Sequence, residues 1–492
     1  MQQTVHIHTK DTASTNMTSR AADIASFYNI DGTAASIVSH GFRRLALQFP
    51  DTMLPDAVQV QLQLRAALST HEHAIERMFV LGDTSYGSCC VDEVAAQHLF
   101  ADCVVHFGRA CLSPTSALPV IYVFGNVPCD VAAVAAGFGD VLAADADSAT
   151  QHILLYEPCY QHVAAEITAA LAATYPDRNF LCSTMRTFYQ PGDEADGGAA
   201  DSTFIGGMSI PLSPADAFHP STSTLLYVGK ESPHLTNILL RAGETVCLSF
   251  DPQTAAARRE GASINRTLNR RYFLVQKAKE AQIVGILMGT LGVANCLDVV
   301  STLQSLVAKS GRKAYTFVVG KINVPKLSNF AEIDVFCLVA CAENTLLDST
   351  DFFKPIVTPY ELQLALTDDD SWSANYKADF QEVLPAMVTA VDEMDDDAPP
   401  RDEPYFSLVT GKYHQSKSQL EDDDDDNDVD DEASSTALVA KAGKQQLAAY
   451  KSEAAAFLKT RDYQGLDPRV GETAPHAAVP GATGIARGYT HE

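Results

Sequence analysis

A short apolar run, then a polar or Gly-bearing loop, then an amphipathic helical pattern recurs along most of this chain. Strands that alternate with helices are typical of α/β folds with parallel sheets, because parallel strands need a long crossover connection. The pattern predicts strands at 44–49, 78–83, 103–108, 119–125, 152–158, 224–230, 245–250, 282–289, 314–321 and 335–340. It predicts helices at 22–42, 55–68, 162–175, 269–281 and 296–310.

The strands that this pattern predicts fall into three clusters along the sequence. Each cluster has the size of a small α/β domain. We therefore expect three similar α/β domains with parallel sheets, at residues 26–135, 136–250 and 251–366. Outside them we expect a disordered N-terminus at 1–25, an acidic disordered linker at 367–435, and a C-terminal helix with a Gly-rich tail at 436–492.

The formal net charge of −27 disfavours nucleic acid as a partner, because binding to phosphates needs clustered Lys and Arg. Residues 421–432 alone carry ten carboxylates in twelve positions, and such a block repels itself and stays solvated. The N-terminus is polar, and no apolar run is long enough to span a bilayer. We therefore expect a soluble, cytoplasmic protein with no membrane partner.

The chain has eleven cysteines, and in a large cytoplasmic protein we expect them to be reduced. Three of them lie inside apolar strand patterns and are predicted to pack in the core: Cys103, Cys247 and Cys337. Three others come just after predicted strands, where the functional loops of α/β sheets gather: Cys89, Cys111 and Cys341. Core packing, a disulfide, a catalytic thiol and a metal ligand are all open for these strand-end thiols.

Cys89 and Cys90 are adjacent in the stretch GDTSYGSCCVDE at 82–93. Neighbouring residues of a strand point to opposite faces, so we expect one thiol to face the loop site while the other packs. A disulfide between them would be strained, and no C-x-x-C spacing indicates a zinc ribbon. One cysteine from each of several loops, meeting in space, is the remaining way to build a metal site.

The segment GILMGTLG at 285–292 joins a predicted strand to a predicted helix. Its backbone amides are suited to hold an anion at the start of the helix. A tight turn between strand and helix explains its glycines equally well, so both interpretations stay open.

Four long blocks resemble the diphthamide biosynthesis 1 and 2 family: 81–98 (LGDTSYGSCCVDEVAAQH), 101–125 (ADCVVHFGRACLSPTSALPVIYVFG), 285–292 (GILMGTLG) and 320–366 (GKINVPKLSNFAEIDVFCLVACAENTLLDSTDFFKPIVTPYELQLAL). The resemblance runs from about residue 26 to 366 and returns in YQGL and GIARGY of the tail. Within the family, CAENTLLD at 341–348 and the tail are similar to the second subunit.

The resemblance implies three α/β domains around a central [4Fe-4S] cluster. It implies a complex that transfers a 3-amino-3-carboxypropyl group from S-adenosylmethionine to a histidine of translation elongation factor 2. This radical reaction is the first step of diphthamide biosynthesis. The implied partners are diphthamide biosynthesis protein 1 in a heterodimer, elongation factor 2 as the protein substrate, and an electron-donor protein.

The family's cluster ligands can be carried over residue by residue. Cys89 matches the first cluster cysteine and Cys341 the last, whereas the middle-domain stretch 211–230 has no cysteine where catalytic members carry one. Cys111 matches the extra cysteine of the second subunit. The resemblance therefore predicts Cys89, Cys111 and Cys341 as metal ligands, and Cys90 as a packed or spare thiol that can replace Cys89. No catalytic residue is assigned to this chain.

Three functional hypotheses follow. In the first, the chain is an accessory subunit that relays an electron to the cluster of a catalytic paralogue, which the missing middle-domain cysteine favours. In the second, it is a self-sufficient homodimeric transferase with its own S-adenosylmethionine site. In the third, the thiols are buried or hold zinc, and the chain is a scaffold for its partner.

Overall fold

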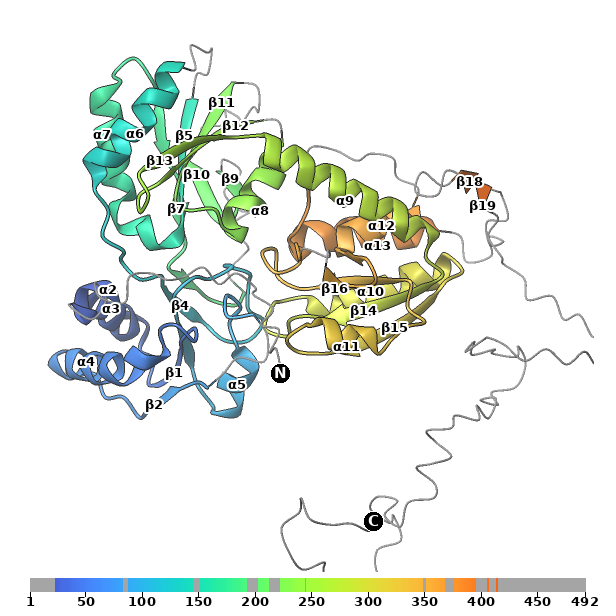
Figure 1. The fold of residues 1–492 in the computed structure, drawn as a ribbon. Helices are drawn as coiled ribbons and strands as arrows, with labels where there is room; N and C mark the ends of the chain where they lie inside the picture. The colour runs from blue at the N-terminus through green and yellow to red at the C-terminus, as the bar shows by residue number, and fades with distance from the viewer. Residues whose placement is uncertain are drawn as a thin grey trace, which may run out of the picture. The chain divides into compact units, whose positions relative to one another are not determined.

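The computed structural model describes residues 23–82, 87–144, 151–192, 202–211, 222–243, 245–347, 351–367, 376–394, 405–406 and 413–414. The acidic block at 421–432 and the predicted helix and tail at 436–492 lie outside the described residues, as do residues 1–22. Among the described residues, no helix is both long and apolar enough to cross a membrane. Three larger sheets, each flanked by helices, make up most of this part of the chain (Figure 1).

The first sheet has the strand order β2-β1-β3-β4-β8. Its strands are β1 (Arg44–Gln48), β2 (Arg77–Val80), β3 (Cys103–Phe107), β4 (Val120–Val123) and β8 (Phe188–Tyr189). All pairings are parallel except that of β4 with β8. Its helices are α2 (Ile24–Phe27), α3 (Ile30–His40), α4 (Ala57–Thr70), α5 (Glu93–His98) and the 3-10 turn η1 (Leu54–Asp56).

The second sheet has the order β13-β12-β11-β5-β6, with only the β12–β13 pair antiparallel. Its strands are β5 (Gln151–Tyr156), β6 (Phe180–Cys182), β11 (Ser223–Val228), β12 (Val246–Asp251) and β13 (Ala256–Glu260). Its helices are α6 (Val131–Ala144), η2 (Pro158–Val163), α7 (Ala164–Thr174) and α8 (Pro233–Ala242). A small antiparallel sheet, β7-β10-β9, adds β7 (Thr184–Met185), β9 (Ser202–Ile205) and β10 (Met208–Pro211).

The third sheet is fully parallel, in the order β15-β14-β16-β17. Its strands are β14 (Ile283–Met288), β15 (Lys313–Val318), β16 (Val335–Val339) and β17 (Ile356–Val357). Its helices are α9 (Ala262–Glu280), α10 (Cys296–Lys309), α11 (Val324–Ser328), α12 (Pro359–Thr367) and α13 (Phe380–Glu393). The long helix α9 connects the second sheet to the third (Figure 1). Two short strands, β18 (Tyr405–Phe406) and β19 (Tyr413–His414), pair with each other.

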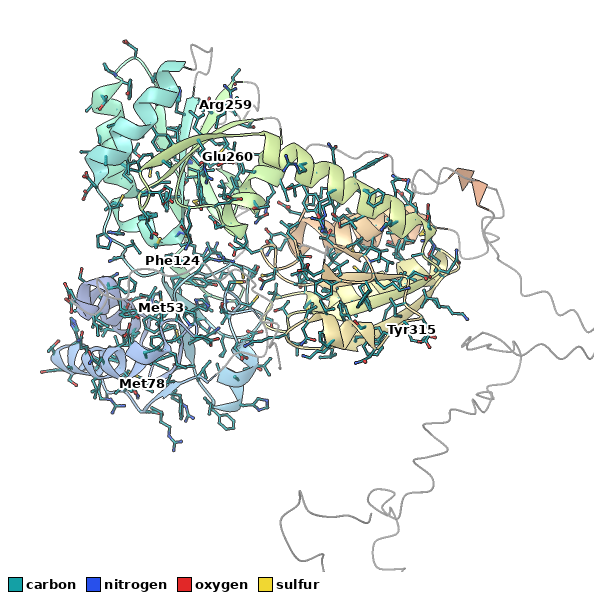
Figure 2. The ribbon with its side chains drawn as sticks, in the orientation of Figure 1. Met53, Met78, Phe124, Arg259, Glu260 and Tyr315 are labelled. Carbon is teal, nitrogen blue, oxygen red and sulfur yellow. The ribbon has the colours of Figure 1, made fainter. Side chains whose placement is uncertain are left out.

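The predicted strands were found because most of them are buried on both faces. In β3, β5, β11 and β16 every residue is buried, and such strands appear in a sequence as unbroken apolar runs. The prediction that Cys103, Cys247 and Cys337 pack inside strands is confirmed, since each is at most 1% exposed. At the edge of the third sheet the burial ends, and Tyr315 of β15 is 49% exposed (Figure 2).

Part of the segment 367–435, which we predicted to be a disordered linker, is helical. Helix α13 buries Phe380, Val383 and Met387, whose spacing of three and four residues places them on one helical face. Arg241 of α8 holds the start of the helix by ion pairs to Asp379, at 2.9 Å, and to Glu382. The acidic composition around this apolar stripe concealed it, so the prediction of disorder was wrong for α13.

Candidate metal centre

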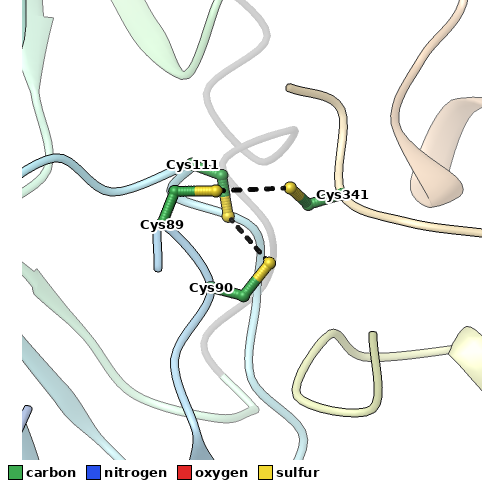
Figure 3. A group of neighbouring side chains, drawn as sticks. All are labelled: Cys89, Cys90, Cys111 and Cys341. Carbon is green, nitrogen blue, oxygen red and sulfur yellow. Dashed lines mark hydrogen bonds between the residues drawn. The ribbon is translucent and has the colours of Figure 1, made fainter. Parts of the chain in front are cut away.

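Four thiols meet where loops from the first and third sheets come together: Cys89, Cys90, Cys111 and Cys341. We call them the cysteine group. Their Sγ atoms all lie within 4.8 Å of one another. The Sγ of Cys89 is 3.7 Å from that of Cys341, and the Sγ of Cys111 is 4.0 Å from that of Cys90 (Figure 3). The fold thus brings the three strand-end cysteines together across a sequence separation of 252 residues.

Cys90 belongs to this group, against the expectation that it points away from Cys89. That expectation assumed a strand, but β2 already ends at Val80 and the two cysteines lie in a turn. The N–H of Cys90 bonds the carbonyl of Gly87 at 3.1 Å, and the N–H of Cys111 bonds the carbonyl of Cys89 at 3.0 Å. In a turn of this kind the alternation of a strand does not apply, so both thiols can face the same side.

Polar side chains at the ends of the first sheet's strands hold this turn in place. Gln48, the last residue of β1 and only 1% exposed, donates from Nε2 to the Cys90 carbonyl at 2.7 Å. Its Oε1 accepts the N–H of Asp92 at 2.8 Å. His106 of β3 lies with its Nε2 3.2 Å from the Ser88 carbonyl. The sequence signal for Gln48 is a single amide that directly follows the apolar run Leu45–Leu47 of β1.

The acidic pair after the cysteines has a structural role. Asp92 caps α5, with its Oδ1 accepting the N–H of Ala95 at 3.0 Å. Glu93 is buried, and its Oε2 accepts the N–H of Ala117 at 2.9 Å, while its Oε1 accepts from the N–H and hydroxyl of Ser116. Glu93 thereby ties the loop that follows Cys111 to the turn that carries Cys89 and Cys90.

The glycine-rich loop of the third sheet packs against the same turn. A Cβ at Gly292 would lie 2.0 Å from the carbonyl oxygen of Val91, so only glycine allows this approach. This contact gives Gly292 a role in close backbone packing between the two loops, which neither the anion site nor the tight turn predicted for residues 285–292 includes.

A buried ion-pair network beside the thiols joins loops of all three sheets. Glu343, two residues after Cys341, is 2.5 Å from Nη2 of Arg109 and 3.0 Å from Nδ1 of His234 at the start of α8. Burial disfavours the Arg109 cation, but Glu343, Cys89 and Glu157 together outweigh it, so the pKa of Arg109 is raised. Because these residues belong to separate sheets, no spacing in the sequence predicts the network.

The thiols of the cysteine group differ in acidity. Hydrogen bonds from Cys341, Cys89 and Cys90 lower the pKa of Cys111 well below its usual range, against the effect of burial. The contact with Cys111 raises the pKa values of Cys89 and Cys341, and burial adds to the rise. Contacts among the thiols therefore favour a thiolate within the group, and a thiolate is the form that binds metals.

The donor set of the cysteine group fits a metal. Four thiolates around a zinc ion, each about 2.3 Å from it, are separated by about 3.8 Å. The measured separations of 3.7 and 4.0 Å are close to this value. Cysteine thiolates are also the ligands of iron–sulfur clusters, and because a cluster is larger than one ion, the thiols must move apart to hold it.

A cavity of about 130 Å³ lies next to the cysteine group, between residues of the first and second sheets. Ser88 and Arg109 reach it from the side of the thiols, and Glu157 and Lys230 reach it from the second sheet. Met53 and Phe124, labelled in Figure 2, supply part of its apolar lining. Burial raises the pKa of Glu157, although Lys230, His234 and Arg109 act in the opposite direction.

The second sheet adds no thiol to the cysteine group. Among the residues that the structure describes, its cysteines Cys159, Cys182 and Cys247 all lie outside the group. The described part of the chain is thus a protein of three larger α/β sheets with a group of four cysteines whose thiols could hold a metal.

The comparison with protein families assigns the chain. Residues 49–377 match the model of a family described as putative diphthamide synthesis protein, and the chain belongs to that family. The family resemblance predicted from the sequence is confirmed.

The similar curated proteins are named 2-(3-amino-3-carboxypropyl)histidine synthase subunit 2. The relative from Danio rerio is 36% identical, covering 98% of this chain and 95% of the relative. Those from Gallus gallus and Schizosaccharomyces pombe are 39% and 37% identical, covering 95% and 96% of this chain and 93% and 92% of the relatives. The prediction that the chain resembles the second subunit is confirmed.

Solved structures share the fold. The crystal structure of Dph2 from Pyrococcus horikoshii with a 4Fe-4S cluster has a TM-score of 0.50 and 19% identity, over 71% of this chain and 92% of that one. A second structure of the same protein has a TM-score of 0.50 and 18% identity, over 71% and 94%. The prediction of an α/β fold with several parallel sheets is confirmed.

Proposed function

We propose that this chain is the iron–sulfur subunit of the complex that transfers a 3-amino-3-carboxypropyl group from S-adenosylmethionine to a histidine of translation elongation factor 2. This reaction is the first step of diphthamide biosynthesis. The observation that carries the proposal is the cysteine group, in which loops of two sheets bring four thiols within 4.8 Å of one another. The names of the relatives and the 4Fe-4S cluster of the structural neighbour support it.

Cys89, Cys111 and Cys341 are the proposed cluster ligands, with Cys90 within reach as a fourth thiol. When bound, an iron–sulfur cluster supplies a carrier for one electron. The residues of this chain hold and orient the ligands: Gln48 and His106 fix the turn of Cys89 and Cys90, and Glu93 fixes the loop after Cys111.

The role that we assign to this subunit is to support reduction of the cluster in its catalytic partner, diphthamide biosynthesis protein 1. Two features favour this role over independent catalysis. The first is that the middle-domain stretch 211–230 has no cysteine where catalytic members of the family carry one. The second is Cys90, whose Sγ lies within 4.8 Å of those of the three proposed ligands. It is in reach of the iron that three ligands leave without a thiolate, where it would compete with S-adenosylmethionine.

The test uses the heterodimer under anaerobic conditions with an electron-donor protein. Cys89→Ala combined with Cys341→Ala in this chain is expected to slow reduction of the partner's cluster, while the heterodimer stays intact by gel filtration. Cys337→Ala is the matched control, because Cys337 is a buried thiol of β16 outside the cysteine group. An unchanged rate of reduction in the double variant contradicts the proposed role.

A zinc-bound scaffold is the second candidate function, because the thiol separations suit one tetrahedral ion. In that case the chain stabilises its partner without carrying electrons. Zinc without iron or sulfide after anaerobic purification supports the scaffold and contradicts the redox role.

Independent catalysis by a homodimer makes a different prediction. It requires S-adenosylmethionine to bind this chain alone, which calorimetry measures directly. We expect no binding, and we place the complex in the cytoplasm with elongation factor 2 as its protein substrate.

A further inference from the structure

The side chain of Asn344 crosses from the third sheet to the first and reaches a thiol of the cysteine group. Its Nδ2 lies 3.3 Å from Sγ of Cys89. The turn that carries it is well fixed, since the N–H groups of Asn344 and Thr345 bond the Cys341 carbonyl at 3.0 and 2.9 Å. The hydroxyl of Thr345 bonds the Leu338 carbonyl at 3.0 Å. A hydrogen-bonded turn that follows Cys341 directly therefore places the amide against Cys89.

The opposite loop leaves space for this amide. A Cβ at Gly87 would lie 2.0 Å from Nδ2 of Asn344. The lack of a side chain at Gly87, two residues before Cys89, is thus what lets the amide reach the sulfur. Two loops from different sheets are complementary at this contact.

The orientation of the amide follows from the chemistry of the sulfur. A metal-bound thiolate carries no proton and only accepts hydrogen bonds. The donor end of Asn344 must therefore face Cys89 when a metal is bound, as it does in this structure.

We propose that Asn344 is a positioning residue that raises the reduction potential of the cluster through its hydrogen bond to Cys89. The inference rests on the proposed function, because it needs a cluster held by Cys89. One electron entering the cluster adds one negative charge, which spreads over the irons and their sulfur ligands. An N–H donor to a ligand sulfur stabilises that charge, so the reduced form is favoured.

This effect matters for the direction of electron flow. A more positive potential makes uptake of an electron from a donor protein easier and lowers the driving force for passing it on. Asn344 thereby helps to set the reduction potential of this subunit's cluster relative to the potentials of its electron donor and of the catalytic partner's cluster.

The test is a redox titration of the cluster in the full chain, followed by electron paramagnetic resonance. Asn344→Ala removes the donor and is expected to make the midpoint potential more negative. Gly87→Ala is expected to shift it in the same direction, because the added methyl displaces the amide. The double variant is expected to shift it no further than Asn344→Ala alone, since the methyl then enters vacated space and the two changes act on one contact.

Asn323→Ala is the matched control, because this asparagine serves as a helix cap: its Oδ1 accepts the N–H of Lys326 in α11 at 2.9 Å. It should leave the midpoint potential unchanged. A second readout is the coupling of an exchangeable proton to the reduced cluster, which the wild type should show more strongly than Asn344→Ala.

The outcomes separate the inference from the proposed function. If the wild type binds no iron and sulfide, the proposed function fails. If it binds them and both Asn344→Ala and Gly87→Ala keep the wild-type midpoint potential, the role of Asn344 in setting the potential is overturned. If both variants lose the cluster, Asn344 serves only assembly of the site, and the inference is overturned as well.

Discussion

The cysteine group and a second buried polar cluster, around Glu361 of α12, both join segments far apart in the sequence. The carboxylate of Glu361 accepts two N–H groups of Arg271, on α9, at 2.5 and 2.6 Å. It also accepts the Tyr376 hydroxyl and the Thr358 N–H, each at 2.9 Å. In the cysteine group, by contrast, the thiols contact one another at 3.7 and 4.0 Å.

The two clusters differ in how well their own contacts satisfy their buried polar groups. The four hydrogen bonds of Glu361 use both of its oxygens, so this buried carboxylate is satisfied by protein alone. Thiols are weak donors and weak acceptors, so four of them facing each other gain little from the contact. The Glu361 network is complete without a ligand, whereas the proposed metal would give the thiols of the cysteine group the strong partner that they lack.

Glu361→Gln should have the largest effect on stability. It leaves the guanidinium of Arg271, which is 5% exposed, without its counter-charge, and we expect the free energy of unfolding to fall by about 3–5 kcal/mol. Urea unfolding measures the loss. The control is Glu382→Gln. The carboxylate of Glu382 is 40% exposed and pairs with Arg241, so its loss should lower the free energy of unfolding by about 1 kcal/mol or less. Similar losses in the two variants would contradict the account of the Glu361 network.

Gln48→Leu tests the support of the cysteine group. It leaves the Cys90 carbonyl and the Asp92 N–H unpaired, so we expect a loss of about 1–3 kcal/mol together with a lower metal content. Gln304→Leu is the matched control, because Gln304 is exposed and bonds only the Thr316 hydroxyl, at 2.9 Å, among the contacts described. Full metal content in Gln48→Leu would show that the metal site does not depend on the two hydrogen bonds of Gln48.

Cys341→Ser should lower metal content with little loss of stability, whereas Cys337→Ser should lower stability and leave metal content unchanged. In the metal-free protein, the hydroxyl of Cys341→Ser keeps the other three thiols as polar neighbours, so the change should cost about 1 kcal/mol or less. Cys337→Ser places a hydroxyl in a fully buried strand and should cost about 1–3 kcal/mol. Metal analysis should show the reverse, with metal lost from Cys341→Ser and kept by Cys337→Ser. Loss of metal from both would mean that unfolding, not ligation, explains the loss.

Cys90→Ala should have the smallest effect. With Cys89, Cys111 and Cys341 still present, we expect metal content to stay near that of the wild type. Cys89→Ala should keep part of the metal because Cys90 lies in the same group, and the variant lacking both should keep none. A larger loss in Cys90→Ala than in Cys89→Ala would reverse the assignment of the two thiols.

Much of the fold is readable from the sequence, because buried parallel strands give apolar runs with helices between them. The exceptions include helices α6, α8 and α12, which the pattern did not predict, and the edges of the sheets. Strands β7 and β8 have two residues each and carry no pattern, and α13 is hidden by the acidic residues around its apolar face. Antiparallel pairing at β8 and β13 follows from local turns that periodicity does not report.

The candidate site is readable only in part. Strand-end position and family resemblance found Cys89, Cys111 and Cys341, since loops at the ends of parallel strands meet in space. Cys90 was misjudged because a turn, and not a strand, sets its direction. Gln48 and Asn344 could not be found, because their roles depend on contacts between segments far apart in the sequence.

The most direct test of the central claim is metal analysis of the wild-type chain purified without oxygen. The account predicts about four iron and four sulfide per chain, as a [4Fe-4S] cluster requires, both lost when Cys89 and Cys341 are replaced. About one zinc per chain without sulfide would contradict it, because the cysteine group would then be a structural zinc site.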